Sequence, residues 1–285
     1  MVRRLRRDRS EADCERRATA SAPDGSDALP SLKRCAWRTS TAVLFWLSGA
    51  ILPASAQDQS VTALVRAYPD FLADHDEKDL IWKDGTRMPL SDGLGDKSFE
   101  EKLRRASLLD QLSTPYPKGP MKKQSGPQED PGRFRNAAFF DKMYGDCSKG
   151  EVQKKLTKVP WLPKSGGGSV QITSVNGVAD RLRAISAELD ALRPELKKFA
   201  VPSAGAFNCR TVEDTGVRSM HAWGAAIDAN TELADYWLWS PKGSGYRNRL
   251  PFEIVRIFEN YRFIWGGKWE HFDTMHFEYR PELLD

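Results

Sequence analysis

Histidine and carboxylate side chains gather in two stretches of the C-terminal half of the sequence. The chain has four histidines, and three of them fall in these stretches. The first stretch holds His221 and Asp228, and the second holds His271, Asp273 and His276. Two imidazoles and a carboxylate are a typical ligand set of a catalytic zinc ion, which keeps a fourth position for water. We therefore expect the two stretches to lie against each other.

The first stretch predicts a turn followed by a strand. Gly224 permits a turn that brings the side chains of His221 and Asp228 together. The sequence Ala-Ala-Ile-Asp then has the character of a buried strand, and an aspartate there is costly unless it is paired or bound to a cation. This favours a metal site. The alternative is a capped turn whose histidine is hydrogen-bonded in the core.

The second stretch needs a break in the chain. In a regular strand Asp273 and His276 would face opposite sides, whereas a break at Thr274-Met275 lets both face one site. His276 is then the third ligand, and Asp273 is the general base that takes a proton from water. His271 is the competing ligand, or else a polar strand residue. His75 lies in an acidic turn, and we do not expect it in the site.

Two spaced motifs together resemble one known family. They are Ser219-x-His221-x-x-Gly224-x-Ala226-x-Asp228 and Asp273-x-x-His276-Phe277. The pair resembles the zinc D-alanyl-D-alanine carboxypeptidases, which include vancomycin-resistance D,D-peptidases and L-alanyl-D-glutamate endopeptidases. The resemblance covers roughly Val170 to Leu284. It implies an α+β fold in which a small antiparallel sheet, flanked by helices, carries zinc (Zn²⁺) on His221, Asp228 and His276, with Asp273 as the catalytic carboxylate.

The resemblance also implies roles for residues near the ligands. Arg210 occupies the place of the family's arginine that binds the substrate carbonyl or the developing oxyanion; the alternative is an ordinary ion pair. Ser219 would hydrogen-bond the substrate or a ligand. Glu278 shares a strand face with His276, so it either orients that ligand or belongs to the surface.

Together with the ligand set, the resemblance implies a secreted zinc metallopeptidase that hydrolyses peptidoglycan stem peptides, as a D-Ala-D-Ala carboxypeptidase or an L-Ala-D-Glu-type endopeptidase. The main alternative is a non-catalytic, zinc-stabilised cell-wall-binding module, and another is a hydrolase of a different secreted peptide or amide. We expect the loops at 114–132 and 240–248 to set how closed the cleft is. There is no His-Glu-x-x-His motif, which argues against the helical zinc-peptidase arrangement.

The N-terminus has the pattern of an export signal. Basic residues precede an uncharged run, residues 39–56, which has an apolar centre and ends in Ala54-Ser55-Ala56. This predicts cleavage after Ala56 and a periplasmic or secreted protein with no stable membrane anchor. The alternative is a membrane anchor, for which the run is borderline in length.

Charge and length set the predicted organisation of the chain. The 285 residues carry a formal charge of +4, and the basic excess lies within residues 1–38, so we expect no nucleic-acid partner. We predict a leader and signal peptide at 1–56, an N-terminal extension packing on the core at 57–165 and a zinc peptidase domain at 166–285. Cys147 and Cys209 remain after export, which predicts one disulfide rather than two buried thiols.

Apolar spacing predicts the main elements around the motifs. Steps of three and four residues from Val178 onward indicate a helix that Pro194 ends or kinks, with Ser174 or Asn176 as its cap. A second helix is expected to open at Pro251, and a strand at 261–265 follows it. Residues 99–112 also show helical spacing.

Overall fold

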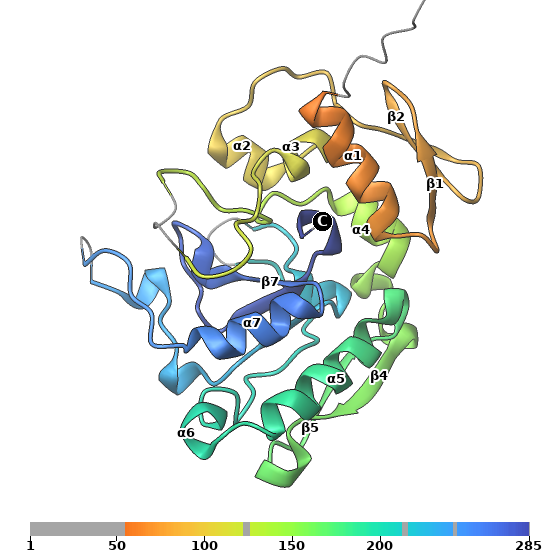
Figure 1. The fold of residues 1–285 in the computed structure, drawn as a ribbon. Helices are drawn as coiled ribbons and strands as arrows, with labels where there is room; N and C mark the ends of the chain where they lie inside the picture. Colours follow the sequence, from red (N-terminus) through yellow and green to blue (C-terminus); the bar gives the residue numbers. More distant parts are fainter. Residues whose placement is uncertain (1–54, 122–125, 213–215, 242–243, 285) are drawn as a thin grey trace, which may run out of the picture. The chain divides into compact units, whose positions relative to one another are not determined.

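A three-stranded antiparallel sheet brings the two predicted site stretches together (Figure 1). Its order is β6 (Ala226–Asp228), β8 (His276–Tyr279) and β7 (Phe263–Trp265). In the register between β6 and β8, Asp228 lies opposite His276. Two predicted ligands therefore stand side by side at one end of the sheet. The computed structural model describes residues 55–121, 126–212, 216–241 and 244–284.

Helix α7 (Phe252–Asn260) lies across β7 in Figure 1 and buries one face of this sheet. It begins directly after Pro251, as predicted, because the fixed φ of proline suits the start of a helix. Its residues Val255 and Phe258 point inward and are almost completely buried. Phe258 stacks on Phe277 of β8, with ring centroids 3.8 Å apart. This packing fixes the strand that carries His276.

A second, two-stranded sheet pairs β4 (Leu156–Pro160) with β5 (Ser169–Thr173), and α5 (Val178–Asp190) packs on it. The predicted helix ends before Pro194, which begins the short helix α6 (Pro194–Lys197). The predicted cap was wrong. No side chain caps α5; Gly177 precedes it in a left-handed conformation instead.

The N-terminal part of the described chain forms a helix, a three-stranded hairpin sheet and three further helices. These elements are α1 (Ala56–Ala67), β1 (Leu72–His75), β2 (Asp79–Trp82), β3 (Arg87–Pro89), α2 (Phe99–Arg104), α3 (Leu108–Leu112) and α4 (Ala137–Tyr144). The helical spacing over 99–112 is divided between α2 and α3. The division falls where Ser107 and Asp110 form a capping box that starts a new helix.

This N-terminal part shares buried contacts with the C-terminal sheet. The hydroxyl of Tyr68, which follows α1, donates a 2.7 Å hydrogen bond to Glu282. Phe140 of α4 packs on Trp223, with ring centroids 5.0 Å apart. Apolar residues of both parts belong to one buried cluster.

Short 3₁₀ turns connect the longer elements. They are η1 (Cys147–Lys149), η2 (Gln153–Lys155), η3 (Pro163–Ser165), η4 (Val175–Gly177), η5 (Met220–Trp223), η6 (Thr231–Leu233), η7 (Trp237–Trp239), η8 (Gly266–Lys268) and η9 (Pro281–Leu283). Helices mixed with small antiparallel sheets confirm the predicted α+β class.

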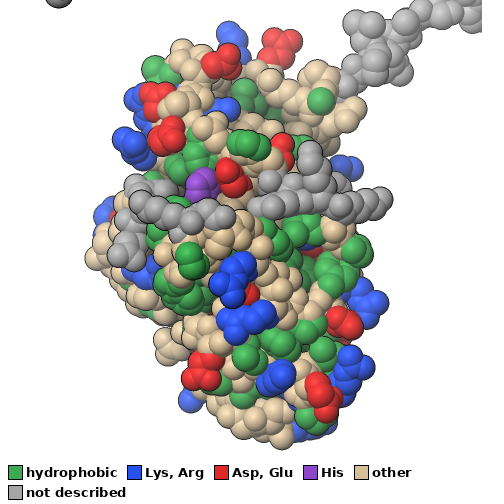
Figure 2. Space-filling model, turned by 90° about the vertical axis from the view of Figure 1, so that its left-hand side faces the viewer, with side chains coloured by type: hydrophobic (Ala, Val, Ile, Leu, Met, Phe, Trp, Pro, Cys, Tyr) green, Lys and Arg blue, Asp and Glu red, His purple; other side chains and the backbone are tan. Residues whose placement is uncertain are grey.

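The predicted leader falls largely outside the described residues, which begin at Ser55. Ser55 itself caps α1 by accepting a hydrogen bond from the backbone N–H of Asp58. Within the described residues, no helix combines the length and the apolar character that a membrane span requires. On the face shown in Figure 2, basic and acidic side chains are interspersed with hydrophobic ones. Export and the lack of a nucleic-acid partner stay predictions.

Candidate active site

Three donor atoms from His221, Asp228 and His276 form a compact triangle. His221 Nε2 lies 3.0 Å from Asp228 Oδ1 and 3.1 Å from His276 Nδ1, and the last two atoms are 3.1 Å apart. A tetrahedral zinc ion with ligands at about 2.0–2.1 Å holds its ligand atoms about 3.3 Å from one another. The donor types and their spacing therefore fit a metal ion, as one face of a tetrahedron.

The turn η5 presents His221 to this triangle. Ser219 caps the turn, its hydroxyl accepting a hydrogen bond from the backbone N–H of His221 at 3.3 Å. Gly224 ends the turn at φ +65°, where an added Cβ would lie 2.8 Å from Leu156 Cδ2. The Nδ1 of His221 contacts the carbonyl of Ala206. Since a carbonyl only accepts, Nδ1 carries the hydrogen and Nε2 faces the triangle.

His276 is held from its opposite ring nitrogen. Its Nε2 lies 2.9 Å from Glu278 Oε2, which leaves Nδ1 toward the triangle. Burial alone would lower the pKa of His276, but hydrogen bonds to Asp228 and Glu278 raise it to about 9. Burial opposes ionisation of Asp228 as well, yet the two histidines bring its pKa well below the ordinary value. In the metal-free protein, Asp228 and His276 therefore each favour the charged form of the other.

Asp273 lines the cleft beside the triangle, and one of its two carboxylate oxygens has no hydrogen-bond partner among the described residues. The chain turns at Thr274-Met275 as predicted, so Asp273 precedes β8 while His276 begins it. The Oδ1 atom of Asp273 is buried and has no hydrogen-bond partner among the described residues. Burial chiefly raises the pKa of Asp273, to about 6, and the nearby charge of Asp228 adds to this. A carboxylate of this kind is suited to accept a proton and to return it.

A cleft of about 220 Å³ opens onto the triangle. Asp228, Asp273 and His276 line it together with the predicted residues Arg210 and Ser219. The side chain of Arg210 is exposed, and it forms no ion pair with any described residue. The structure therefore brings the predicted catalytic and substrate-binding residues to one cleft, while their roles stay predictions.

His271 lines the cleft but does not join the triangle. Its Nδ1 lies 2.8 Å from Asp130 Oδ2, and its backbone N–H donates to the other oxygen of Asp130 at 3.2 Å. The ring stacks on Phe99 and meets Trp237 edge-on. His75 contacts Thr62 of α1 and does not line the cleft, as expected.

Several residues that line the cleft were not expected from the sequence. They are Arg133, Arg135, Val212, Tyr236, Trp237, Trp239, Trp269 and Met275. The aromatic run at 236–239 was a usable signal in the sequence. In the structure, Trp239 is 63% exposed and packs against Tyr236. The two arginines offered none, since they lie far from the motifs along the chain.

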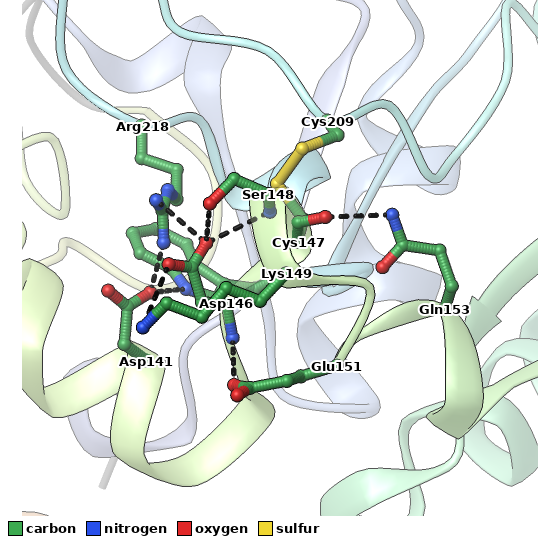
Figure 3. The surroundings of a disulfide bond; sticks show 10 residues. Asp141, Asp146, Cys147, Ser148, Lys149, Glu151, Gln153, Cys209 and Arg218 are labelled. Carbon is green, nitrogen blue, oxygen red and sulfur yellow. Dashed lines mark hydrogen bonds and ion pairs between the residues drawn. A yellow bond between two sulfur atoms is a disulfide. The ribbon is translucent and has the colours of Figure 1, made fainter.

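The predicted disulfide between Cys147 and Cys209 is confirmed. Figure 3 shows Cys147 in the turn after α4, joined to Cys209, which directly precedes Arg210. Arg218 pairs with Asp141 and with Asp146, the latter at 3.0 Å. The bridge and these ion pairs tie both ends of segment 209–218 to the region of α4 and η1, and so help to place Arg210.

A family model matches part of the chain. Residues 213–279 match a family model described as D-alanyl-D-alanine carboxypeptidase. The matched segment contains the triangle and Asp273, and it covers less than a quarter of the chain. The match supports a peptidase related to this family without distinguishing a subfamily. No curated protein and no solved structure matches the chain significantly.

Proposed function

We propose that this protein is an exported zinc peptidase that hydrolyses peptidoglycan stem peptides at an amide bond next to a D-residue. The observation that carries the proposal is the triangle of two imidazole nitrogens and one carboxylate oxygen, which opens onto a cleft that also holds Asp273. The match to the D-alanyl-D-alanine carboxypeptidase model supports the reaction class.

The triangle would hold zinc through His221 Nε2, Asp228 Oδ1 and His276 Nδ1. When bound, zinc supplies a Lewis acid toward the substrate carbonyl and lowers the pKa of water. Asp273, whose own pKa is raised to about 6 by burial, accepts the proton of the attacking water and passes it to the leaving nitrogen.

Charge in the cleft fits an anionic peptide. Arg210 lies at the cleft without an ion-pair partner among the described residues, so its guanidinium can stabilise negative charge on the carbonyl oxygen. Ser219 uses a lone pair to cap η5, which leaves its hydroxyl hydrogen for the substrate. The export-signal pattern and the disulfide support action outside the cytoplasm.

The decisive experiment is digestion of purified muropeptides, followed by mass spectrometry, with and without a chelator. Release of a terminal D-alanine identifies a carboxypeptidase, and an internal cut identifies an endopeptidase. Whichever activity is found should be lost with the chelator and should return when zinc is restored. Binding to cell-wall sacculi without any cleavage would instead support the non-catalytic wall-binding module.

A further inference from the structure

Two buried arginines reach the cleft from outside the segment that matches the peptidase family. Arg133 and Arg135 precede α4, and each is only 6% exposed. The chain before them passes tightly against the C-terminal part. At Gly132, which has φ +92°, an added Cβ would lie 2.3 Å from Ile264 Cδ1 of β7. The position of these arginines is therefore set by close packing.

Arg135 and the ligand His276 meet on the same carboxylate oxygen. The Nη2 of Arg135 donates to Glu278 Oε2, and the Nε2 of His276 lies 2.9 Å from that atom. The other oxygen of Glu278 accepts from Arg280 Nη1 at 3.0 Å. Glu278 is fully buried, so these three donors define where its carboxylate lies.

Arg135 and Arg280 do not hold Glu278 in the same way. Arg280 also pairs with Glu282, at 2.6 Å, and donates to the carbonyl of Gly132. Arg135 is paired with Glu278 alone among the described carboxylates. Arg135 is thus the dedicated counter-ion of this carboxylate.

We propose that Arg135 is a positioning residue for the metal centre. Through Glu278 it holds the imidazole of His276 with Nδ1 turned toward the other two donor atoms. The N-terminal extension then completes the metal site, although it lies outside the matched peptidase segment. This inference rests on the zinc site of the proposed function.

Zinc affinity of the full exported chain tests this role without relying on turnover. Affinity is measured by competition with a chromogenic chelator. Arg135→Gln should weaken zinc binding by about 10- to 100-fold, the usual effect of losing a group that orients a ligand. Arg133→Gln is the matched control, because Arg133 has the same exposure and the same loop but pairs with Asp130. Its zinc affinity should equal that of the wild type.

A double-mutant cycle shows whether Arg135 acts through Glu278. If it does, Arg135→Gln should cause no further loss in a Glu278→Gln background. Arg135→Lys keeps the charge and should recover part of the affinity, and it serves in place of Arg135→Gln if that variant does not fold. Circular dichroism of each variant establishes the folded state.

The outcomes separate this inference from the proposed function. If zinc binds Arg135→Gln as tightly as the wild type, the positioning role is overturned while the peptidase assignment stands. The positioning role is also overturned if Arg135→Gln reduces zinc affinity by the same factor in the wild type and in the Glu278→Gln background. If the wild-type chain binds no zinc, both the inference and the proposed function fail.

Discussion

Two carboxylates flank His276, and the two regions that hold them differ in what surrounds each acid. Glu278 lies on β8, where Arg135, Arg280 and His276 all contact it. Asp273 lies in the turn before β8, and its Oδ1 has no hydrogen-bond partner among the described residues. Burial acts on both, yet the pKa of Glu278 is lowered and that of Asp273 is raised to about 6.

The difference shows that the donors around a buried carboxylate decide its chemistry more than burial itself. A carboxylate that is fully paired stays charged and serves to orient its neighbours. A buried carboxylate with fewer donors, such as Asp273, holds its proton more readily and can exchange that proton with substrate. Environments that push two acids apart in pKa are a common basis for dividing roles in an active site.

The largest expected effect is the loss of catalysis when Asp273 is replaced. Asp273→Ala should lower kcat by about 10²- to 10⁴-fold, because proton transfer loses its acceptor. Zinc should remain bound, since Asp273 is not one of the three donor residues. Steady-state kinetics on a muropeptide and metal analysis of the same sample check both halves. Unchanged hydrolysis would remove Asp273 from the mechanism.

The next effect concerns the stability supplied on the Glu278 side. Glu278→Gln should destabilise the metal-free protein by about 3 kcal/mol near neutral pH, because two buried arginines lose a counter-charge. The folded pKa of Glu278 lies below the unfolded one, so this contribution is fully present above about pH 5 and is lost as the solution becomes more acidic. Denaturant titrations of both proteins at several pH values measure it. A pH-independent difference would contradict the ion-pair account.

Asp273 should show the opposite pH dependence. Its folded pKa is raised to about 6, so the protonated form stabilises the folded state and the benefit is lost as pH rises through 6. Asp273→Asn should therefore stabilise the metal-free protein by about 1–2 kcal/mol at pH 8 and have no effect at pH 4. Thermal unfolding at the two pH values tests the sign. A destabilised variant at pH 8 would mean that hydrogen bonds and nearby charges stabilise the carboxylate by more than burial opposes it.

The smallest expected effect tests whether His271 belongs to the metal site. His271→Asn should leave zinc affinity unchanged, because His271 contacts Asp130 and not the three donor atoms. His276→Asn, as the comparison variant, should lose zinc binding. Equal losses in the two variants would make His271 a ligand after all.

Much of the site followed from local patterns in the sequence. The small residues around Gly224 predicted the turn of η5, and a break at Thr274-Met275 was needed for Asp273 and His276 to share a site. Pro194 predicted that α5 would end before it, Pro251 predicted the start of α7, and the two remaining cysteines predicted the bridge. Each of these features depends on residues close in sequence or on simple pairing rules.

The partners of the site residues could not be predicted in this way. His271 was an open choice between a ligand and a polar strand residue until Asp130 was placed beside it. Arg135 carried no motif, and its contact with Glu278 joins residues 143 positions apart. Glu278 itself was assigned equally to the site and to the surface.

The sequence by itself determined which side chains are able to bind a cation and where the chain must turn, because backbone preferences and ligand chemistry are local properties. Only the tertiary structure decided which buried charges face one another. The pairing of these charges depends on the close packing of residues 132–135 against β7 and β8. Burial there makes a carboxylate's charge state sensitive to each hydrogen-bond donor that it has or lacks.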